Sequence, residues 1–142
     1  MKIGDIVTRT PACITGSATQ TEAAMEMKIL DVGILLVYEN GQLVGIVTDR
    51  DIAIRGIANE IDPKTTPVRD IMTQDVISCF EDQKVAEAAR LMEEHRIRRL
   101  PVLDRSKRLV GIVSLSEIAL RAGGENVVDE VLQQLSGPPV FV

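Results

Sequence analysis

The sequence of 142 residues contains few aromatic residues, histidines or cysteines. It has two phenylalanines, one tyrosine and no tryptophan, too few rings for the stacking platforms that bind single-stranded nucleic acid. One histidine and two cysteines cannot form a cluster that holds zinc through protein ligands alone. We therefore expect no metal site, and a bound base is expected to lie against aliphatic side chains.

Long apolar runs and an excess of positive charge are also missing. No run approaches the roughly 20 apolar residues that cross a bilayer, and the N-terminal MKIGDIVTRT lacks the apolar segment of a signal peptide. The net charge of -5 disfavours broad binding to nucleic acid but allows a local basic pocket. We expect a cytoplasmic protein without a membrane or nucleic-acid partner, whose Cys13 and Cys79 are reduced, half-buried strand residues.

An internal repeat is the main positive feature of the sequence. Residues 43–53, LVGIVTDRDIA, recur as residues 109–119, LVGIVSLSEIA. Further matches upstream share one constant spacing, and the spacing is one residue longer from Leu43 onward. This difference indicates one extra residue in the second copy, in the turn of residues 104–107, which corresponds to residues 39–41 of the first copy. The matched residues upstream are Asp5, Ile6, Thr8, Glu22, Ala23, Ala24 and Met27 in the first copy, and Asp70, Ile71, Thr73, Glu87, Ala88, Ala89 and Met92 in the second.

Each copy reads as strand, helix, strand, strand, helix. Brief strands are expected at 12–14 and 76–79, and further apolar runs at 33–38 and 100–103 precede the repeated strands. Ser17, with Gln20 three residues later, has the spacing of a helix cap. Asn40-Gly41 predicts a hairpin turn. The expected apolar helix faces are Ala23, Ala24, Met27 and Leu30 in the first copy, and Val85, Ala88, Ala89 and Met92, with Asp82 near the helix start, in the second.

The repeats predict the division of the chain. Residues 1–58 form the first repeat, the polar segment 59–67 with two prolines is a linker, and 68–123 form the second repeat. Gly123-Gly124 ends the last repeat helix, and residues 124–142 form a tail. In that tail Val128, Val131, Leu132 and Leu135 share a helical face before Gly137-Pro138-Pro139 stops the helix. Because about 60 residues bury too little surface alone, we expect the repeats to form one module of mixed α+β class.

The acidic residue after each repeated strand has two interpretations. Thr48 with Asp51, and Ser114 with Glu117, have the spacing of a capping box that stabilises a helix start by about 0.5–2 kcal/mol without any ligand. Alternatively, the carboxylate accepts hydrogen bonds from a ribose diol while the hydroxyl and the helix N–H groups face a phosphate. Both roles are compatible.

Arg98 and Arg99 lead directly into an apolar strand. Such arginines are commonly solvated surface charges, but two together can hold a phosphate through charge-assisted hydrogen bonds. Gly33 and Ile34 take these positions in the first copy. His95 and Arg96 are explained as favourable charges at a helix C-terminus. No serine elbow, phosphate loop or nucleophile pair of known spacing is present, so we do not expect an enzyme.

The duplicated βαββα pattern, the motif Gly-Ile-Val-(Thr/Ser)-x-x-(Asp/Glu) and Arg-Leu-Pro-Val in the second copy resemble a tandem pair of CBS domains, the Bateman module. The resemblance extends from Ile3 to about Gly123. It implies two repeats related by a pseudo-twofold axis, with their sheets packed together and two clefts that bind adenosyl ligands such as AMP, ADP, ATP or S-adenosylmethionine. It also implies a homodimer.

The resemblance further implies composite clefts, each using residues of both copies. The main cleft would contain Thr48, Asp51, Thr73, Val76, Ser78, Ile97, Arg98 and Arg99, with Ser116 near a phosphate. The second cleft would contain Thr8, Pro11, Cys13, Val32, Gly33, Ile34, Ser114 and Glu117. Because the second cleft has a longer acid and no basic pair, we expect it to be weak or empty.

These observations predict a regulatory protein that senses adenine nucleotides, requires no cofactor, and signals to an unidentified protein through its dimer geometry. The alternative is a ligand-free dimerisation or interaction scaffold whose acidic motifs are only helix caps. A homodimer is expected because apolar residues of the tail face and of the helices after Thr48 and Ser114 exceed what one small pair can bury. Those helix residues are Ile52, Ala53, Ile57, Ile118 and Ala119.

Overall fold

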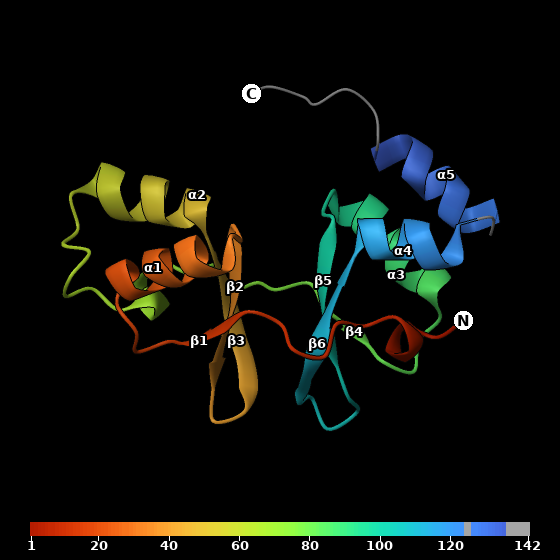
Figure 1. The fold of residues 1–142 in the computed structure, drawn as a ribbon, viewed down its shortest axis with the longest axis horizontal. Helices are drawn as coiled ribbons and strands as arrows, with labels where there is room; N and C mark the ends of the chain where they lie inside the picture. The colour runs from red at the N-terminus through yellow and green to blue at the C-terminus, as the bar shows by residue number, and fades with distance from the viewer. Residues whose placement is uncertain (124–125, 136–142) are drawn as a thin grey trace. The chain divides into compact units, whose positions relative to one another are not determined.

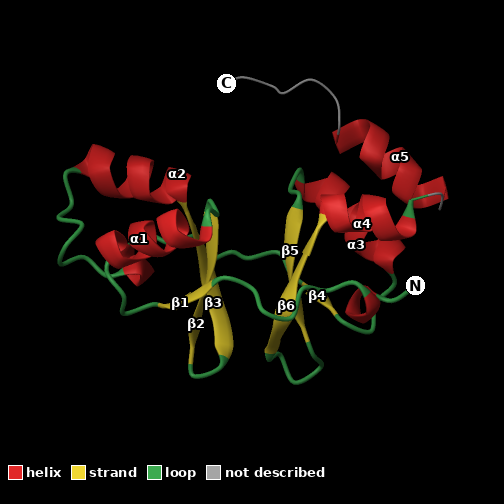
Figure 2. Ribbon diagram, viewed as in Figure 1, coloured by secondary structure: helices red, strands yellow, loops and turns green. Residues whose placement is uncertain are grey.

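The computed structural model describes residues 1–123 and 126–135 (Figure 1). The first copy contains β1 (Cys13–Thr15), α1 (Gln20–Leu30), β2 (Ile34–Glu39), β3 (Gln42–Thr48) and α2 (Asp49–Asp51). The second contains β4 (Cys79–Phe80), α3 (Val85–His95), β5 (Arg99–Leu103), β6 (Leu109–Ser114) and α4 (Leu115–Ala122), followed by the tail helix α5 (Asn126–Leu135). The predicted βαββα order and mixed α+β class are confirmed (Figure 2).

Each copy builds one three-stranded sheet, in the orders β1-β2-β3 and β4-β5-β6. β1 pairs parallel with β2, β2 antiparallel with β3, and β4 parallel with β5. Asn40 and Gly41 adopt positive φ angles of 54° and 76°, which confirms the predicted hairpin turn. The longer turn of the second copy contains Lys107, whose φ is 64°.

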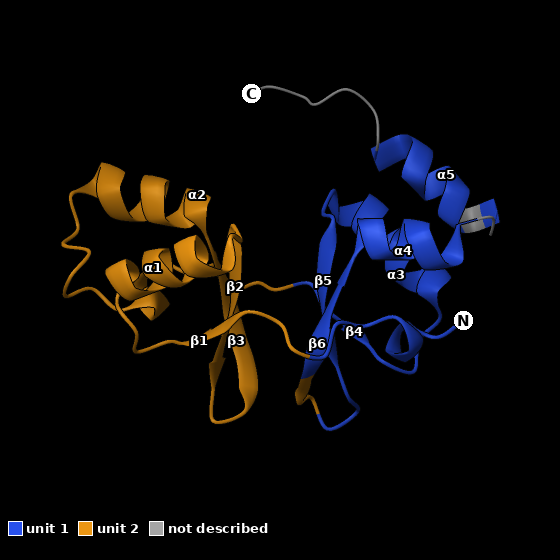
Figure 3. Ribbon diagram, viewed as in Figure 1, with its two compact units in different colours: residues 1–9, 77–106, 110–142 blue, residues 10–76, 107–109 orange. Residues whose placement is uncertain are grey.

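The compact units of the structure exchange the opening segments of the two copies (Figure 3). Unit 1 comprises Met1–Arg9, Ile77–Ser106 and Val110–Val142, and unit 2 comprises Thr10–Val76 and Lys107–Leu109. The opening of the first copy therefore belongs to the unit that carries the sheet and helices of the second, and the reverse holds for residues 68–76. The predicted boundaries follow the sequence repeats instead.

The repeated glycine explains how each opening segment packs. In unit 1, Thr8 and Ile112 exchange backbone hydrogen bonds of 2.9 and 3.1 Å, and in unit 2 Ile46 and Thr73 do the same at 3.0 and 2.8 Å. A Cβ at Gly45 would lie 2.8 Å from the carbonyl oxygen of Thr73, and a Cβ at Gly111 would overlap that of Thr8. The glycine of each Gly-Ile-Val is therefore needed for this close approach.

The core of unit 1 includes the tail helix. The predicted stripe Val85, Ala88, Ala89 and Met92 is fully buried. On α5, Val128 is 0% exposed, Val131 1% and Leu135 8%, and all belong to the same apolar cluster as α3 and α4. The expectation that the tail face is free for dimerisation is therefore wrong, because α5 packs against α3 and α4. Ile118, expected on the same surface, is also fully buried.

In unit 2, Ala23 and Met27 of α1 pack into the core, but Ala24 and Leu30 are exposed. The cap is Thr19, whose side chain accepts a hydrogen bond from the backbone N–H of Glu22 at 3.2 Å. The prediction of Ser17 as the cap is wrong, because the helix begins at Gln20 and the Ser17 hydroxyl lies 3.3 Å from that of Thr15.

Several predicted boundaries also differ. β4 is shorter than predicted because only Cys79 and Phe80 pair with β5. Asp82 precedes α3 and binds Arg105. The helix after Thr48 continues as a π-helix, Ile52–Gly56, and a 3₁₀ turn, Ile57–Asn59, which the sequence pattern did not predict.

Gly123 follows α4, whereas Gly124 and Gly137-Pro138-Pro139 lie outside the described residues. In the described segments no helix is long and apolar enough to cross a membrane.

Candidate functional site

The acidic residue after each repeated strand caps a helix. The Thr48 hydroxyl accepts the backbone N–H of Asp51 at 3.1 Å, and the Asp51 carboxylate accepts that of Thr48 at 3.1 Å. Ser114 and Glu117 form the same reciprocal pair at 3.2 and 3.3 Å. The capping interpretation is therefore confirmed for both copies.

These carboxylates also bind the opening segment within each unit. The Thr73 hydroxyl donates to the Asp51 carboxylate at 3.4 Å, and the Thr8 hydroxyl donates to Glu117 at 2.8 Å. Asp51 is only 8% exposed, and Arg55 lies 3.7 Å from its carboxylate. These bonds were not predicted from the sequence, although a threonine and an acid at matching positions of both copies were the signal for them.

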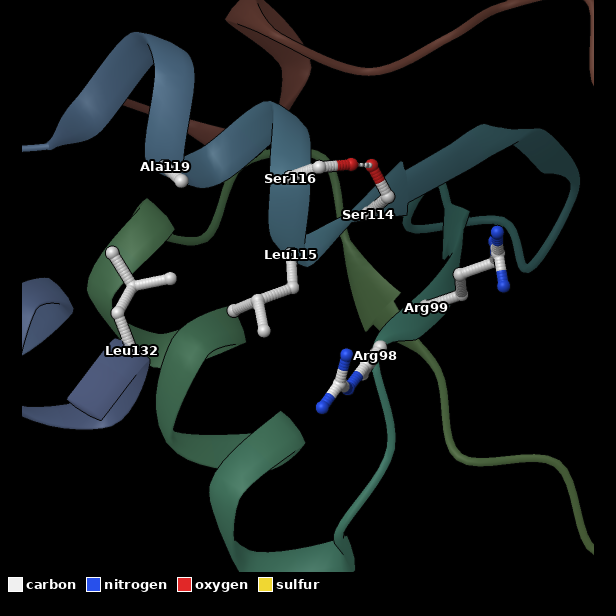
Figure 4. Close-up of a pocket in the computed structure, with 7 residues that line it drawn as sticks. All are labelled: Arg98, Arg99, Ser114, Leu115, Ser116, Ala119 and Leu132. Atoms are coloured by element: carbon white, nitrogen blue, oxygen red, sulfur yellow. Dashed lines mark hydrogen bonds between the residues drawn. The ribbon is translucent and has the colours of Figure 1, made fainter. Parts of the chain in front are cut away.

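Unit 1 has a pocket of about 440 Å³ beside the start of α4 (Figure 4). The Ser114 and Ser116 hydroxyls lie 3.0 Å apart. The side chains of Arg98, in the bend before β5, and Arg99, the first residue of β5, point in different directions (Figure 4). The pocket is lined by Arg98, Arg99, Ser114, Leu115, Ser116, Ala119 and Leu132.

The two arginines differ in their contacts. A guanidinium N–H of Arg98 donates to the backbone carbonyl of Leu135 at 2.7 Å, at the last residue of α5. Arg99 is exposed at the start of β5. Within residues 1–123 and 126–135, neither guanidinium forms an ion pair with a carboxylate. Both positive charges are therefore free of neutralising partners there.

Unit 2 differs at the matching positions. Gly33 and Ile34 replace the two arginines, and Asp49 replaces Leu115. A Cβ at Gly33 would lie 3.0 Å from a carboxylate oxygen of Asp49. This part of unit 2 therefore lacks the arginine pair and places an acid close to its strand.

The predicted site residues are divided between the compact units. Of the main-cleft residues, Thr48, Asp51, Thr73 and Val76 belong to unit 2, and Ser78, Ile97, Arg98, Arg99 and Ser116 to unit 1. Of the second-cleft residues, Thr8, Ser114 and Glu117 belong to unit 1, and Pro11, Cys13, Val32, Gly33 and Ile34 to unit 2. The structure brings Ser114 together with the arginines and Ser116, and it adds three apolar residues that were not predicted as site residues, Leu115, Ala119 and Leu132. The composite clefts remain a prediction.

A second hollow, of about 420 Å³, lies at the hairpin end of unit 2. It is lined by Thr15, Ser17, Tyr38, Glu39, Asn40 and Arg69. Two of these residues, Arg69 and Glu39, form an ion pair of 3.0 Å. At the matching corner of unit 1, Arg105 lies 4.2 Å above the Phe80 ring and forms two 2.8 Å bonds to Asp82. The smaller side chains of unit 2 leave that corner open.

The cysteines are poorly suited to nucleophilic chemistry. Burial raises the pKa of the Cys79 thiol to about 12 and also raises the pKa of Cys13. Cys13 is half-buried as predicted, whereas Cys79 is 2% exposed. In the part of the chain that the structure describes, no group of three or more His, Cys, Asp or Glu residues is arranged to hold a metal ion.

Known proteins share both the sequence and the fold. The CBS domain family matches residues 3–55 and 68–123. The CBS domain-containing protein YhcV of Bacillus subtilis is 37% identical over 134 residues, 94% of each chain.

Two solved structures are similar as well. The CBS domain pair of protein MJ0100, in complex with 5'-methylthioadenosine and S-adenosyl-L-methionine, has a TM-score of 0.73 and 31% identity over 89% of this chain and 98% of its own. CBSX2 in complex with AMP has a TM-score of 0.73 and 26% identity over 85% of this chain and 95% of its own. The repeated motifs, the two three-stranded sheets and these matches establish that the chain belongs to the CBS domain family, as a tandem pair.

Proposed function

We propose that the protein is a regulatory, non-catalytic module that binds an adenine nucleotide. The observation that carries the proposal is the pocket in unit 1, which Arg98 and Arg99 line together with the paired hydroxyls of Ser114 and Ser116. Two cationic groups and two hydroxyls are suited to bind a phosphate. Family members with adenosyl ligands, MJ0100 and CBSX2, support the adenosine part of the ligand.

The helix caps do not exclude a ribose. A carboxylate has about four lone-pair positions, and the Asp51 oxygens accept the Thr48 N–H at 3.1 Å and two long contacts of 3.4 Å from the Thr73 hydroxyl, with the Arg55 guanidinium 3.7 Å away. We propose that Asp51 also accepts a ribose hydroxyl, so that one group both caps the helix and binds the ligand. AMP, ADP, ATP and S-adenosylmethionine are the candidates.

The alternative is a ligand-free scaffold, and the capping boxes favour it because they explain Thr48, Asp51, Ser114 and Glu117 without a ligand. It does not explain two adjacent arginines that form no ion pair with a carboxylate of residues 1–123 or 126–135. Calorimetric titration with AMP, ADP, ATP, NADH and S-adenosylmethionine separates the two functions. Binding of any of them excludes the pure scaffold, whereas no heat and no change in melting temperature with all five supports it.

The arginines provide the first test of the phosphate site. Arg98→Ala and Arg99→Ala are expected to weaken a phosphorylated ligand by about 1.5–3 kcal/mol per lost charged hydrogen bond and to leave adenosine affinity nearly unchanged. Calorimetry with AMP and adenosine measures both affinities. Equal losses for the two ligands would show that the arginines do not face phosphate.

We further propose one tight nucleotide per chain. In the predicted second cleft, where Glu117 is the acid, Gly33 and Ile34 stand in place of the arginine pair, and a phosphate without a cationic partner is costly to desolvate. Asp51→Ala and Glu117→Ala are a matched pair, because each removes one capping carboxylate. Only Asp51→Ala is expected to abolish binding, and Glu117→Ala is expected to cost at most about 0.5–2 kcal/mol of stability. Two equivalent nucleotides per chain would contradict this asymmetry.

We propose that the module signals as a homodimer. Unit 2 exposes large apolar side chains on α1 and on the helix after Thr48, among them Ile29 at 70% exposure and Ile57 at 62%. Exposed large apolar side chains favour association when a partner can bury them. A ligand would change the dimer geometry only if it binds one arrangement better than another, and an unidentified protein would respond to that change.

A further inference from the structure

We propose that the tail helix α5 is part of the phosphate pocket of unit 1, so that anion binding and docking of α5 stabilise each other. This inference deepens the proposed function and rests on it for the nature of the ligand. It concerns only residues of unit 1, namely Arg98, Arg99, the start of α4 and α5.

The first observation is the bond that holds Arg98. The last carbonyls of an α-helix lack partners within the helix and form its negative end. The guanidinium of Arg98 donates to the Leu135 carbonyl at 2.7 Å, so it binds α5 at this end. This bond needs one N–H of five, and within residues 1–123 and 126–135 no other hydrogen bond uses the remaining donors, which can serve a ligand. The docked helix therefore holds Arg98 in place without removing its charge from the pocket.

The second observation is that α5 forms a wall of the same pocket. Leu132 lines it together with Arg98 and Ser116, and Figure 4 shows Leu132 on a different helix from the α4 residues. Leu132 is half-buried, and its neighbours Val131 and Leu135 are fixed in the core of unit 1. Undocking α5 would remove this wall and release Arg98 in one step.

Reciprocal coupling follows from these contacts. If a docked α5 orders Arg98 and closes one wall, then α5 docking raises the affinity for an anion, and a bound anion must favour docking by the same factor. Ordering a long arginine side chain before binding lowers the entropic cost of binding. Nothing at the matching positions of unit 2 can do this, because Gly33 stands where Arg98 is in unit 1.

Two variants of α5 test the coupling. Val131→Asp places a charge at a residue that is 1% exposed and should undock α5, whereas Gln134→Asp adds the same charge at an exposed position of the same helix. With pyrophosphate and ATP as probes in calorimetry, Val131→Asp is expected to lose at least about tenfold in affinity and Gln134→Asp less than about twofold. Unchanged or tighter binding by a folded Val131→Asp would overturn the proposal.

Hydrogen exchange on the unaltered protein gives a readout that does not depend on the folding of a variant. Pyrophosphate or ATP is expected to slow amide exchange at residues 126–135, and Arg98→Ala without ligand is expected to speed it. Unchanged exchange in both experiments would overturn the proposal. Protection of α5 by pyrophosphate, combined with no binding of any adenosyl ligand, would support the coupling and reject the proposed nucleotide function. If no anion binds at all, both the proposed coupling and the proposed nucleotide function are wrong.

Discussion

At the scale of single residues, Gly45 and Gly111 decide whether the opening segments can dock. At each of them a Cβ would lie too close to a carbonyl oxygen of the crossing segment, so any side chain would have to displace backbone. Packing of the opening segment is therefore a reason for the glycine of the Gly-Ile-Val motif, whether or not a ligand binds nearby. This explains why the glycine occurs in both copies although only one copy carries the arginine pair.

Gly45→Ala and Gly111→Ala are each expected to reduce the free energy of unfolding by about 1–3 kcal/mol, because the added methyl group overpacks a tight backbone crossing. Gly33→Ala is the control, since the atoms nearest to its Cβ belong to the side chain of Asp49 and not to backbone. Urea denaturation followed by circular dichroism measures all three. A loss below about 0.5 kcal/mol for Gly45 and Gly111 would mean that the crossing relaxes at little cost.

The raised pKa of the Cys79 thiol predicts that the free energy of unfolding depends on pH. A folded-state pKa of about 12 for Cys79 lies above that of an unfolded cysteine, so the folded state binds the thiol proton more tightly. The contribution of Cys79 to stability is therefore complete at neutral pH and is lost as the pH rises through about 9 to 12.

Alkylation with iodoacetamide at pH 8, followed by mass spectrometry, is expected to label Cys13 before Cys79, because Cys13 is half-buried and Cys79 is only 2% exposed. Cys79→Ser should flatten the stability loss above pH 9. Faster labelling of Cys79 in the native protein would contradict its burial.

At the scale of elements, the beginning of α1 shows how tertiary contacts choose among possible caps. Ser17 and Thr19 are both good capping residues, but the N–H of Gln20 bonds to the Thr66 carbonyl and that of Ala18 to the Thr15 carbonyl, which fixes the helix start after Thr19. The residue that begins the helix is therefore chosen by the neighbouring chain.

Thr19→Ala is expected to reduce the free energy of unfolding by about 0.5–2 kcal/mol, because the N–H of Glu22 loses its acceptor. Ser17→Ala should change it by less than about 0.5 kcal/mol, since Ser17 contacts only the Thr15 hydroxyl at the surface. Thermal and urea denaturation compare the two variants. A larger loss of stability in Ser17→Ala than in Thr19→Ala would support Ser17 as the capping residue, as predicted from the sequence.

At the scale of the whole molecule, the two copies have unequal surfaces. In unit 1, α5 covers α3 and α4 with Val128, Val131 and Leu135. Unit 2 has no equivalent of this helix and leaves Met25, Ile29, Ile54 and Ile57 at least half exposed. We therefore propose that the dimer forms through unit 2, and not through the tail face expected from the sequence.

Ile57→Glu is expected to shift the protein from dimer to monomer at micromolar concentration, because a charge would be buried in the proposed apolar interface. Leu120→Glu on α4 is the control, since Leu120 is 86% exposed and lies in unit 1. Light scattering with size-exclusion chromatography measures the mass. A monomeric unaltered protein, or a dimer that persists in Ile57→Glu, would contradict the assignment.

The sequence by itself determined the duplicated βαββα order, the Asn40-Gly41 hairpin, the buried stripe of α3 and both capping boxes, because these depend on local periodicity and spacing. Matched motifs also identified the CBS domain family and singled out Arg98 and Arg99. Such features require no knowledge of which distant segments meet.

Tertiary structure alone decided which opening segment packs on which sheet, the burial of the α5 face, and the bond from Arg98 to the Leu135 carbonyl. An amphipathic face shows that a helix will be covered but not by what. A repeat shows two equal units but not that they exchange their first residues. These outcomes depend on the balance of many long-range contacts, which no local pattern contains.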